Sequence, residues 1–367
     1  VTVPYFPPYL RALGLSGREV SLVLSVTPVF HMTAPLLWGW LADRTRNPAL
    51  VLRIALGGAA LFYAPLVLLH GFPHILLAHA GHQVFNVAVT GLSDTLALLR
   101  VRIGDDYGRA RVWGSTAAIV TCLAVGPALT TRARPGGDPL VPVLVTAALA
   151  LAFLASFSLR GEGNHARPSR ADVGALLRDR RLRFLLVFAS IHWACTAPYH
   201  GFFGILIRDL GLPPTVIGEA FVLGLFGEMV ALFFLRRLRE HLPLPTLLAL
   251  VAGASTVRWL VIAFVRVPVV LVLVQGLHAF TFGLFWGTAL AWLVACVPGH
   301  LRATGQTLYT AATYGGGNLL GMLTTGALYD RFGGASRAFL VAAGVNVVPL
   351  VLALVLGRRL DPERHPH

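Results

Sequence analysis

Long apolar runs separated by short polar breaks dominate the chain. Residues 54–93, 184–207, 267–301 and 303–329 contain no Asp, Glu or Arg. Because about 20 apolar residues span a bilayer, this pattern predicts transmembrane helices. The breaks between the runs carry Gly and Pro, which end helices. The predicted spans are 20–41, 50–70, 74–99, 112–131, 139–159, 184–207, 217–235, 243–265, 268–297, 303–328 and 338–357.

The two ends and the middle of the chain complete this organisation. Residues 1–13 are too short for a span and lack the basic region of a signal peptide, so we interpret them as the outer end of a first helix whose beginning is missing. The prediction is an all-α polytopic membrane protein with 12 transmembrane helices. A polar, Arg-rich segment at 160–183 separates six-helix bundles at 1–159 and 184–367. Such pseudo-symmetric 6+6 halves are typical of transporters built from repeats.

Composition agrees with membrane insertion. Hydrophobic residues make up 56% of the chain, charged residues 13%, and the mean hydropathy is +0.72, whereas soluble domains carry about 25% charge. All 30 basic residues are Arg, and most follow the even-numbered spans or lie in the C-terminal tail. This distribution predicts a multi-pass protein of the cytoplasmic membrane, with the linker and the C-terminus in the cytoplasm. Arginines at span ends do not form the continuous basic face of a nucleic-acid-binding protein.

The positions of the cysteines and histidines do not predict a metal site. Cys122, Cys195 and Cys296 lie in separate apolar runs, where we expect reduced packing residues. His79 and His82 have a spacing that could ligate a metal, but no Cys or acid accompanies them. The absence of Lys excludes a P-loop lysine or a Schiff-base lysine. We therefore expect neither a metal nor a cofactor.

The segment after the second span carries a recognisable motif. It reads Gly39-Trp40-Leu41-Ala42-Asp43-Arg44-Thr45-Arg46. This segment resembles the Gly-x-Leu-Ala-Asp-Arg signature of major facilitator superfamily transporters, which lies in the loop between spans 2 and 3. By this resemblance, Gly39 permits close helix approach, and Asp43 and Arg44 form an inner gate. The equivalent segment of the second half, residues 236–240, lacks the Gly and Asp pattern.

Further residues narrow the resemblance to the phenylpropionate-permease-like branch, related to the lactose permease and to nucleoside–proton symporters. The similar segments are 6–16, 275–283 and the entry to span 5, which contains Tyr107, Gly108, Arg109, Arg111, Trp113, Gly114 and Ser115. The resemblance implies two helical bundles, alternating access and proton-coupled uptake. One departure is Thr281, where lactose-permease relatives carry an acid three residues after the span-10 histidine.

Ionisable residues inside predicted spans are functional candidates, because a charge in the membrane costs several kcal/mol, on the order of 3 on insertion scales. At about 1.5 Å per residue, Glu228, Arg258 and His278 fall in one layer near the midplane. We expect Arg258 to hold a carboxylate or to neutralise Glu228, and Glu228 and His278 to carry protons. Asp94, in the inner third of span 4, could line the cavity or pair with an arginine at the cytoplasmic gate. A buried Arg–Glu pair that only fixes helix packing is the structural alternative.

These features predict a secondary transporter that couples a small organic solute, best an aromatic or other carboxylic acid, to protons. A sugar or nucleoside proton symporter and a drug or metabolite exporter of the same fold remain alternatives. A membrane-embedded acyltransferase fits less well, since no base and nucleophile occur together near one interface. The expected partners are the solute, protons and membrane lipid, with no nucleic acid, and we expect a monomer without enzymatic activity. Glycines at 315–317, 321 and 326 predict a close helix contact.

Overall fold

The computed structural model describes residues 2–45, 47–100, 107–132, 138–159, 173–298 and 301–363. The chain folds into two compact units, Val1–Pro168 and Ser169–His367, and the boundary falls within the segment predicted as a linker. The short helix α7 (Val173–Arg178) belongs to the second unit, so this part of the predicted linker is helical.

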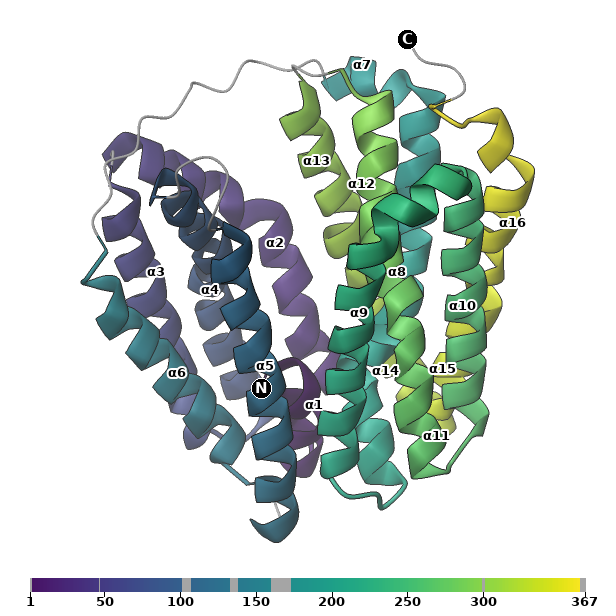
Figure 1. The fold of residues 1–367 in the computed structure, drawn as a ribbon. Coiled ribbons are helices and arrows are strands. Elements are labelled where there is room, and N and C mark those ends of the chain that lie inside the picture. Colours follow the sequence, from purple (N-terminus) through teal and green to yellow (C-terminus); the bar gives the residue numbers. More distant parts are fainter. Residues whose placement is uncertain are drawn as a thin grey trace. The chain divides into compact units, whose positions relative to one another are not determined.

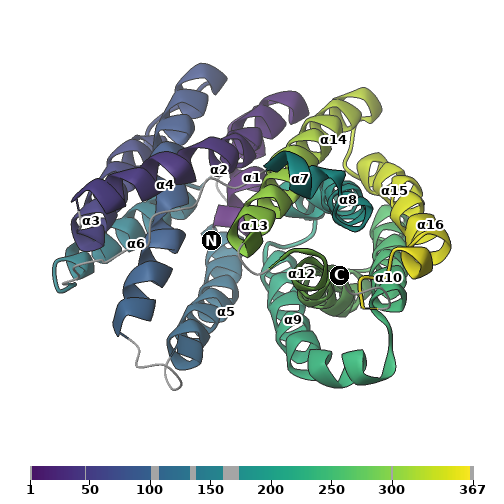
Figure 2. The same cartoon turned by 90° about the horizontal axis from the view of Figure 1, so that it is seen from above.

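Antiparallel helices form the N-terminal unit (Figure 1). In order they are α1 (Thr2–Ala12), α2 (Gly17–Thr45), α3 (Pro48–Tyr63) continued by the 3₁₀ turn η1 (Ala64–Val67), α4 (Phe72–Arg100), α5 (Tyr107–Arg132) and α6 (Leu140–Ser156). Helix α3 packs between α4 and α6, and α2 packs against α4, as the view from above shows (Figure 2). Their shared core includes Val51, Leu56 and Ala88.

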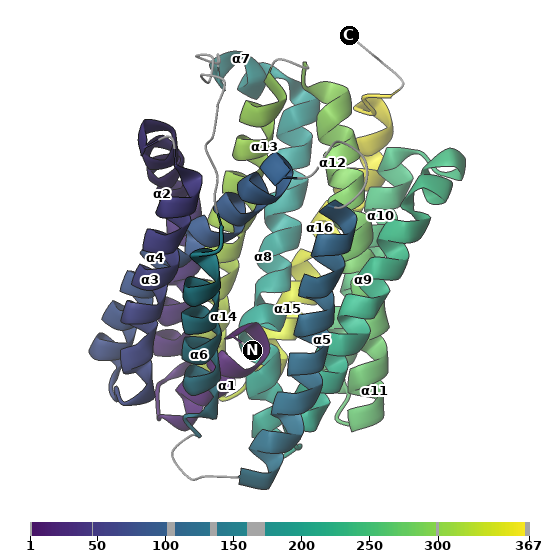
Figure 3. The same cartoon turned by 60° about the vertical axis from the view of Figure 1, so that its left-hand side comes forward.

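The C-terminal unit has the same kind of bundle with more interruptions. Its elements are α8 (Arg180–Asp209), α9 (Thr215–His241), α10 (Leu244–Phe264), α11 (Pro268–Leu273), η2 (Val274–Leu277), η3 (Ala279–Leu284), α12 (Phe285–Cys296), α13 (Arg302–Thr310), η5 (Ala311–Gly317), α14 (Asn318–Phe332), α15 (Ser336–Val345), α16 (Val347–Val355) and η6 (Gly357–Arg359). Helix α8 packs against α12, α14, α15 and α16, and runs along the unit in Figure 3. Phe188, Leu248 and Trp292 belong to its core.

The predicted spans match observed helices to within a few residues. Among the described residues, six helical segments are long and apolar enough to cross a membrane, and two shorter apolar helices accompany them. The six are Pro48–Val67, Phe72–Ser93, Thr215–His241, Leu244–Phe264, Pro268–Cys296 and Ser336–Arg359. One boundary prediction was wrong: the segment expected as a loop from Gly39 is helical through Thr45. Its Leu and Ala favour helix, and the break follows at Asn47, which caps α3 by accepting a hydrogen bond from the Leu50 N–H.

Three spans expected to be continuous are interrupted. The 268–297 span contains a 3₁₀ segment, η2, followed by a π-helical segment, η3. The 303–328 span contains the π segment η5, and the 338–357 span breaks at Asn346 between α15 and α16. Because π segments frequently occur at functional sites, these interruptions direct attention to the C-terminal unit.

Small residues bring α8 close to η5 and α14. A Cβ atom at Gly317 would overlap the carbonyl oxygen of Ser190, and one at Gly321 would overlap that of Ala194. Only glycine fits at these two positions, since any side chain would push the helices apart. The close contact predicted from the Gly-rich stretch is therefore confirmed.

The start of α8 is fixed by a polar cap outside the apolar span. Asp179 accepts a hydrogen bond from the Arg181 N–H at 2.7 Å and forms an ion pair with its guanidinium at 3.0 Å. Burial raises the pKa of Asp179, but these hydrogen bonds and the Arg181 charge outweigh burial and hold it below the ordinary value. An N-cap carboxylate of this kind satisfies a backbone N–H that the helix leaves unpaired.

Candidate functional site in the C-terminal unit

The most deeply buried charge among the described residues is Arg258. It lies on α10, about two turns before the end of that helix, and has 0% exposure. Removing a charged group from water costs several kcal/mol in real proteins, and on the order of 20 kcal/mol in an idealised medium of low dielectric constant. Hydrogen bonds and opposite charges offset part of this cost. The partners of this guanidinium therefore decide what the site can do.

The interrupted helix supplies three hydrogen-bond partners of Arg258. The Arg258 Nε donates to Gln275 Oε1 at 3.1 Å, and its Nη2 donates to the same oxygen. Its Nη1 lies 3.0 Å from His278 Nδ1 and donates to Thr281 Oγ1 at 2.7 Å. Because a guanidinium has no acceptor, the ring nitrogen of His278 accepts, which fixes its tautomer. Among the described residues Arg258 forms no ion pair with a carboxylate.

The local sequence explains why one helix can supply these partners. In a 3₁₀ turn the side chains at i and i+3 lie above one another, and η2 stacks Gln275 over His278 in this way. The π segment η3 follows immediately and carries Thr281. Gly227 of α9 and Gly283 of η3 allow the two elements to approach, since Cβ atoms built on them would lie 3.1 and 2.9 Å from the carbonyl oxygens of Gly276 and Glu228.

Aromatic rings cover the guanidinium where these side chains do not. Its carbon lies 4.1 Å from the ring centroid of Tyr199 on α8 and 4.8 Å from that of Trp259. Both rings are buried. Such cation–π contacts are worth about 2 kcal/mol when desolvated. They offset part of the cost of burial, but they leave the net positive charge in place.

A wider aromatic cluster adjoins His278. Phe282 stacks on the His278 ring at 5.1 Å and contacts Trp193 of α8 at 5.5 Å. Trp193 packs edge-on against Tyr314 of η5 at 4.5 Å, and Tyr314 stacks on Trp286 at 5.3 Å. Phe282, Trp286 and Tyr314 are only partly buried. The cluster therefore presents π faces that a planar or apolar molecule could contact.

Glu228 lies on α9 opposite Gly283, about one helical turn from the His278 level, where Gly224 faces His278. Among the described residues no ion pair joins its carboxylate to the Arg258 guanidinium, whose hydrogen bonds go to Gln275, His278 and Thr281. The structure thus brings Arg258 and His278 together directly. It places Glu228 on α9, one helical turn from Gly224, which faces His278.

Two further buried residues connect to this site. His192 of α8 donates from Nε2 to the Thr281 carbonyl at 3.0 Å. Asn346, at the α15–α16 break, donates to the Ala252 carbonyl at 2.8 Å and to Thr256 Oγ1 at 3.1 Å. From the sequence, Gln275 belonged to a segment of the family resemblance but received no role, and Asn346 was not considered. A polar residue inside an apolar run, at a position where the helix breaks, is the signal that could have identified them.

Comparison with known proteins connects this geometry to a family. A family model described as "MFS_1 like family" matches residues 1–341. The chain belongs to the MFS_1-like family. It is 30% identical to the maltose permease of Geobacillus stearothermophilus over 94% of this chain and 87% of that protein. It is 24% identical to a probable 3-phenylpropionic acid transporter of Escherichia coli, over 91% and 88%.

Solved structures agree on the fold. The nucleoside transporter NupG superimposes with a TM-score of 0.85 at 17% identity, covering 97% of this chain and 94% of that one. The predicted major facilitator fold is thereby confirmed. The chain is an MFS-type membrane transporter of small solutes.

Several residues of the family resemblance fall outside the described part. The side chains of Asp43, Asp94, Tyr107, Arg109, Arg111, Trp113 and Ser115, and the surroundings of Gly39 and Gly108, lie outside the described residues. Arg44 is exposed and its guanidinium lies 5.3 Å from the Trp40 ring centroid. Gly114 is exposed, and no atom lies within 4 Å of a Cβ built on it. The gate assignment of Gly39, Asp43 and Arg44 stays a prediction.

His79, His82 and the cysteines are buried elsewhere. In the N-terminal unit of this MFS-type chain, His82 Nδ1 donates to the Ala59 carbonyl at 3.0 Å, and Gln83 Nε2 lies 3.3 Å from His79 Nε2. Within the described residues no group of three or more His, Cys, Asp or Glu side chains could hold a metal. The cysteines at 122, 195 and 296 are free and buried.

Proposed function

We propose that the protein is a secondary transporter that moves a small organic carboxylate, coupled to protons, across the cytoplasmic membrane by alternating access. The observation that carries this proposal is the fully buried guanidinium of Arg258, whose partners Gln275, His278 and Thr281 are neutral. A carboxylate that replaces Gln275 or Thr281 as acceptor would supply the missing counter-charge and form a bidentate pair. This stabilising ion pair forms only when the cargo is bound.

The aromatic cluster supports an aromatic or apolar body for that carboxylate. Trp286, Tyr314 and Phe282 are partly buried and lie on the His278 side of the guanidinium. Offset stacking against such rings is worth about 1 kcal/mol beyond area burial. The name of the Escherichia coli relative, a probable 3-phenylpropionic acid transporter, is consistent with this chemistry.

Proton coupling is assigned to Glu228 and His278. Glu228 is a carboxylate in the middle of an apolar helix, one turn from His278. His278 receives a hydrogen bond from Arg258 Nη1, and loses that bond if the carboxylate takes this nitrogen. Its free ring nitrogen could then bind a proton. Asp94 is proposed as a cavity or gate residue, and Gly39, Asp43 and Arg44 as the inner gate.

The arrangement in the membrane follows from charge. We propose a C-terminus in the cytoplasm, because arginines concentrate in the segments on that side. The groups proposed to bind cargo all come from one chain, so we propose a monomer.

A sugar is the second candidate. The maltose permease relative shares 30% identity with this chain. Sugar sites commonly combine aromatic faces with neutral hydrogen-bonding groups, and Gln275 and Thr281 are groups of that kind. In that case Arg258 would act as a fixed donor array, and binding would not depend on the charge of the cargo.

Uptake into proteoliposomes tests the proposal. Purified protein is reconstituted, an inward proton gradient is imposed, and accumulation of 3-phenylpropionate, maltose and uridine is measured. We expect 3-phenylpropionate to accumulate above its external concentration, and collapse of the gradient to abolish accumulation. Uptake of maltose or uridine without the acid would contradict the carboxylate assignment. Accumulation that survives gradient collapse would contradict proton coupling.

A matched pair of variants makes this test specific. Arg258→Gln removes the buried charge. Arg266→Gln makes the same change just beyond the end of the same helix, where the guanidinium donates to helix-end carbonyls and to Ser336 Oγ at 2.9 Å. We expect Arg258→Gln to lower uptake about 100-fold, since charged hydrogen bonds contribute about 1.5–3 kcal/mol, and Arg266→Gln to leave it within about twofold.

A further inference from the structure

The end of α9 changes from apolar to basic within a single turn. Leu232, Phe233 and Phe234 are exposed, Phe233 to 80%. Immediately after them come Arg236, Arg237, Arg239 and His241, which are also exposed. A helix of 27 residues is about 40 Å long at 1.5 Å per residue, and therefore exceeds a hydrocarbon core of about 30 Å. The basic turn thus reaches the headgroup layer while the phenylalanines remain in the acyl region.

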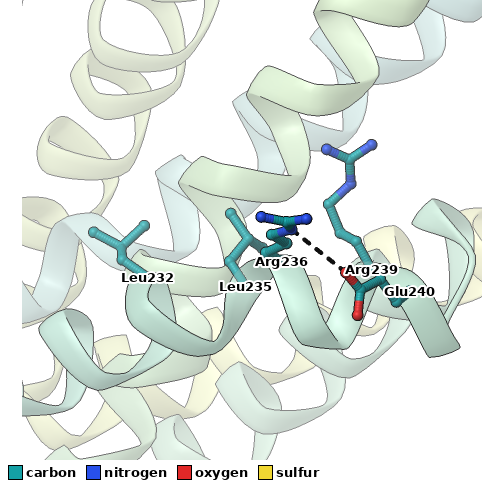
Figure 4. A pocket seen from close by; sticks show the side chains of 5 residues that line it. All are labelled: Leu232, Leu235, Arg236, Arg239 and Glu240. Carbon is teal, nitrogen blue, oxygen red and sulfur yellow. Dashed lines mark ion pairs between the residues drawn. The ribbon is translucent and has the colours of Figure 1, made fainter. Parts of the chain in front are cut away.

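Two surface hollows flank this helix end. One, of about 480 Å³, is lined by Leu232, Leu235, Arg236, Arg239 and Glu240 (Figure 4). The other, of about 420 Å³, is lined by Phe234, Arg237, Leu238, His241 and Leu242. Both combine an apolar floor with basic groups at the rim. They differ in whether acidic side chains already form ion pairs with their arginines.

The first hollow contains its own counter-charges. Arg236 Nε lies 3.4 Å from Glu240 Oε1, as the dashed line in Figure 4 marks. Arg239 Nη2 lies 2.6 Å from Glu363 Oε1. An incoming anion would have to displace these carboxylates, so this hollow is the weaker anion site.

The second hollow has one permanent cation, Arg237, and no acid in its lining. No described carboxylate forms an ion pair with Arg237, and no acid lines the hollow. His241 Nδ1 donates to the Arg237 carbonyl at 2.8 Å, which holds the ring against the helix end. Leu238 and Leu242 pack on the core of the unit, so the floor is anchored. Phe234 continues the lining toward the acyl region.

We propose that this hollow, formed by Phe234, Arg237, Leu238, His241 and Leu242, binds the phosphate of an anionic phospholipid. Arg237 pairs with the phosphate oxygens, for which a guanidinium fork is geometrically suited. The acyl chains lie along the exposed Phe233 and Phe234. The adjacent phenylalanines favour a lipid over a soluble phosphate, because a soluble anion gains nothing from an apolar surface. This site is separate from the transport site and does not depend on the proposed cargo.

Native mass spectrometry of the full-length detergent-solubilised protein tests the site. Apparent dissociation constants are measured for phosphatidylglycerol and for phosphatidylcholine with the same acyl chains. We expect the anionic lipid to bind more tightly, and Arg237→Gln to weaken its binding about fivefold, since a direct ion pair at an exposed site contributes up to about 1 kcal/mol.

Arg180→Gln is the matched control. Arg180 is exposed and begins α8, which is antiparallel to α9 and so starts at the same end of the unit. We expect this variant to bind phosphatidylglycerol as the unmodified protein does. Equal weakening by both variants, no weakening by Arg237→Gln, or equal binding of the two lipids would overturn the proposal. Displacement of the lipid by an equal concentration of inorganic phosphate would also overturn it, since the site would then take a soluble anion.

Discussion

Each unit of the molecule buries a polar cluster among apolar helices, and the two clusters differ in charge and in backbone. In the N-terminal unit, His79, His82 and Gln83 lie on the uninterrupted helix α4 and bond to one another or to a backbone carbonyl. In the C-terminal unit, a permanent cation, Arg258, takes its acceptors from a helix that passes through 3₁₀ and π turns.

The comparison separates two uses of buried polarity. A neutral cluster on a regular helix needs no counter-charge, and its paired groups cost little to bury. A buried cation with neutral partners remains electrostatically incomplete, and irregular backbone beside it costs helix stability that packing elsewhere must offset. We infer that the first cluster fixes packing, and that the second serves transport. Substitutions in matched pairs can test this contrast.

The largest effect is expected for Glu228→Gln. Removing the titratable group should abolish proton-driven accumulation completely, while exchange of labelled for unlabelled solute continues, because the binding groups remain. The measurement is uphill uptake and exchange in proteoliposomes. Glu219→Gln, an exposed position on the same helix, is the control and should accumulate normally. Unchanged uphill uptake in Glu228→Gln would remove Glu228 as the proton carrier.

The next largest effect is expected for Gln275→Ala, with Gln83→Ala as its counterpart in the N-terminal cluster. Gln275→Ala leaves two N–H groups of the buried Arg258 without an acceptor, and we expect uptake to fall about 30-fold, by the value of hydrogen bonds to charged groups. Gln83→Ala removes a neutral partner of His79 and should change uptake by less than about threefold. Initial rates of solute uptake by the two variants in proteoliposomes test this difference. Similar losses in both variants would mean that the clusters do not differ in role.

A smaller effect is expected at Thr281. Thr281→Val keeps the shape and removes one acceptor of Arg258, so that uptake should fall about fivefold, consistent with about 1 kcal/mol for one hydrogen bond. Thr288→Val, a buried threonine on α12 with no hydrogen-bond partner in the described structure, is the control. Its uptake should not change. A loss in Thr288→Val equal to that in Thr281→Val would indicate general sensitivity of the helix.

The spans were predictable because hydrophobic run length and Gly–Pro breaks determine them directly. The interruptions were not, because η2, η3 and η5 contain no Pro and lie inside runs without charged residues. Arg258 and His278 were identified by charge alone. Gln275 was missed because a neutral amide does not stand out in a count of charges. Whether Glu228 pairs with Arg258 depends on which helix faces pack together, and hydropathy does not reveal that.

The proposed transport site depends most directly on Arg258 recognising a negative charge on the cargo. Binding of 3-phenylpropionate and of its neutral amide, 3-phenylpropanamide, to the purified full-length protein is measured by titration calorimetry, in unmodified protein, Arg258→Gln and Arg266→Gln. We predict that the unmodified protein and Arg266→Gln prefer the acid at least about tenfold, and that Arg258→Gln binds the two alike. An undiminished preference for the acid in Arg258→Gln, or no preference in the unmodified protein, would contradict the account.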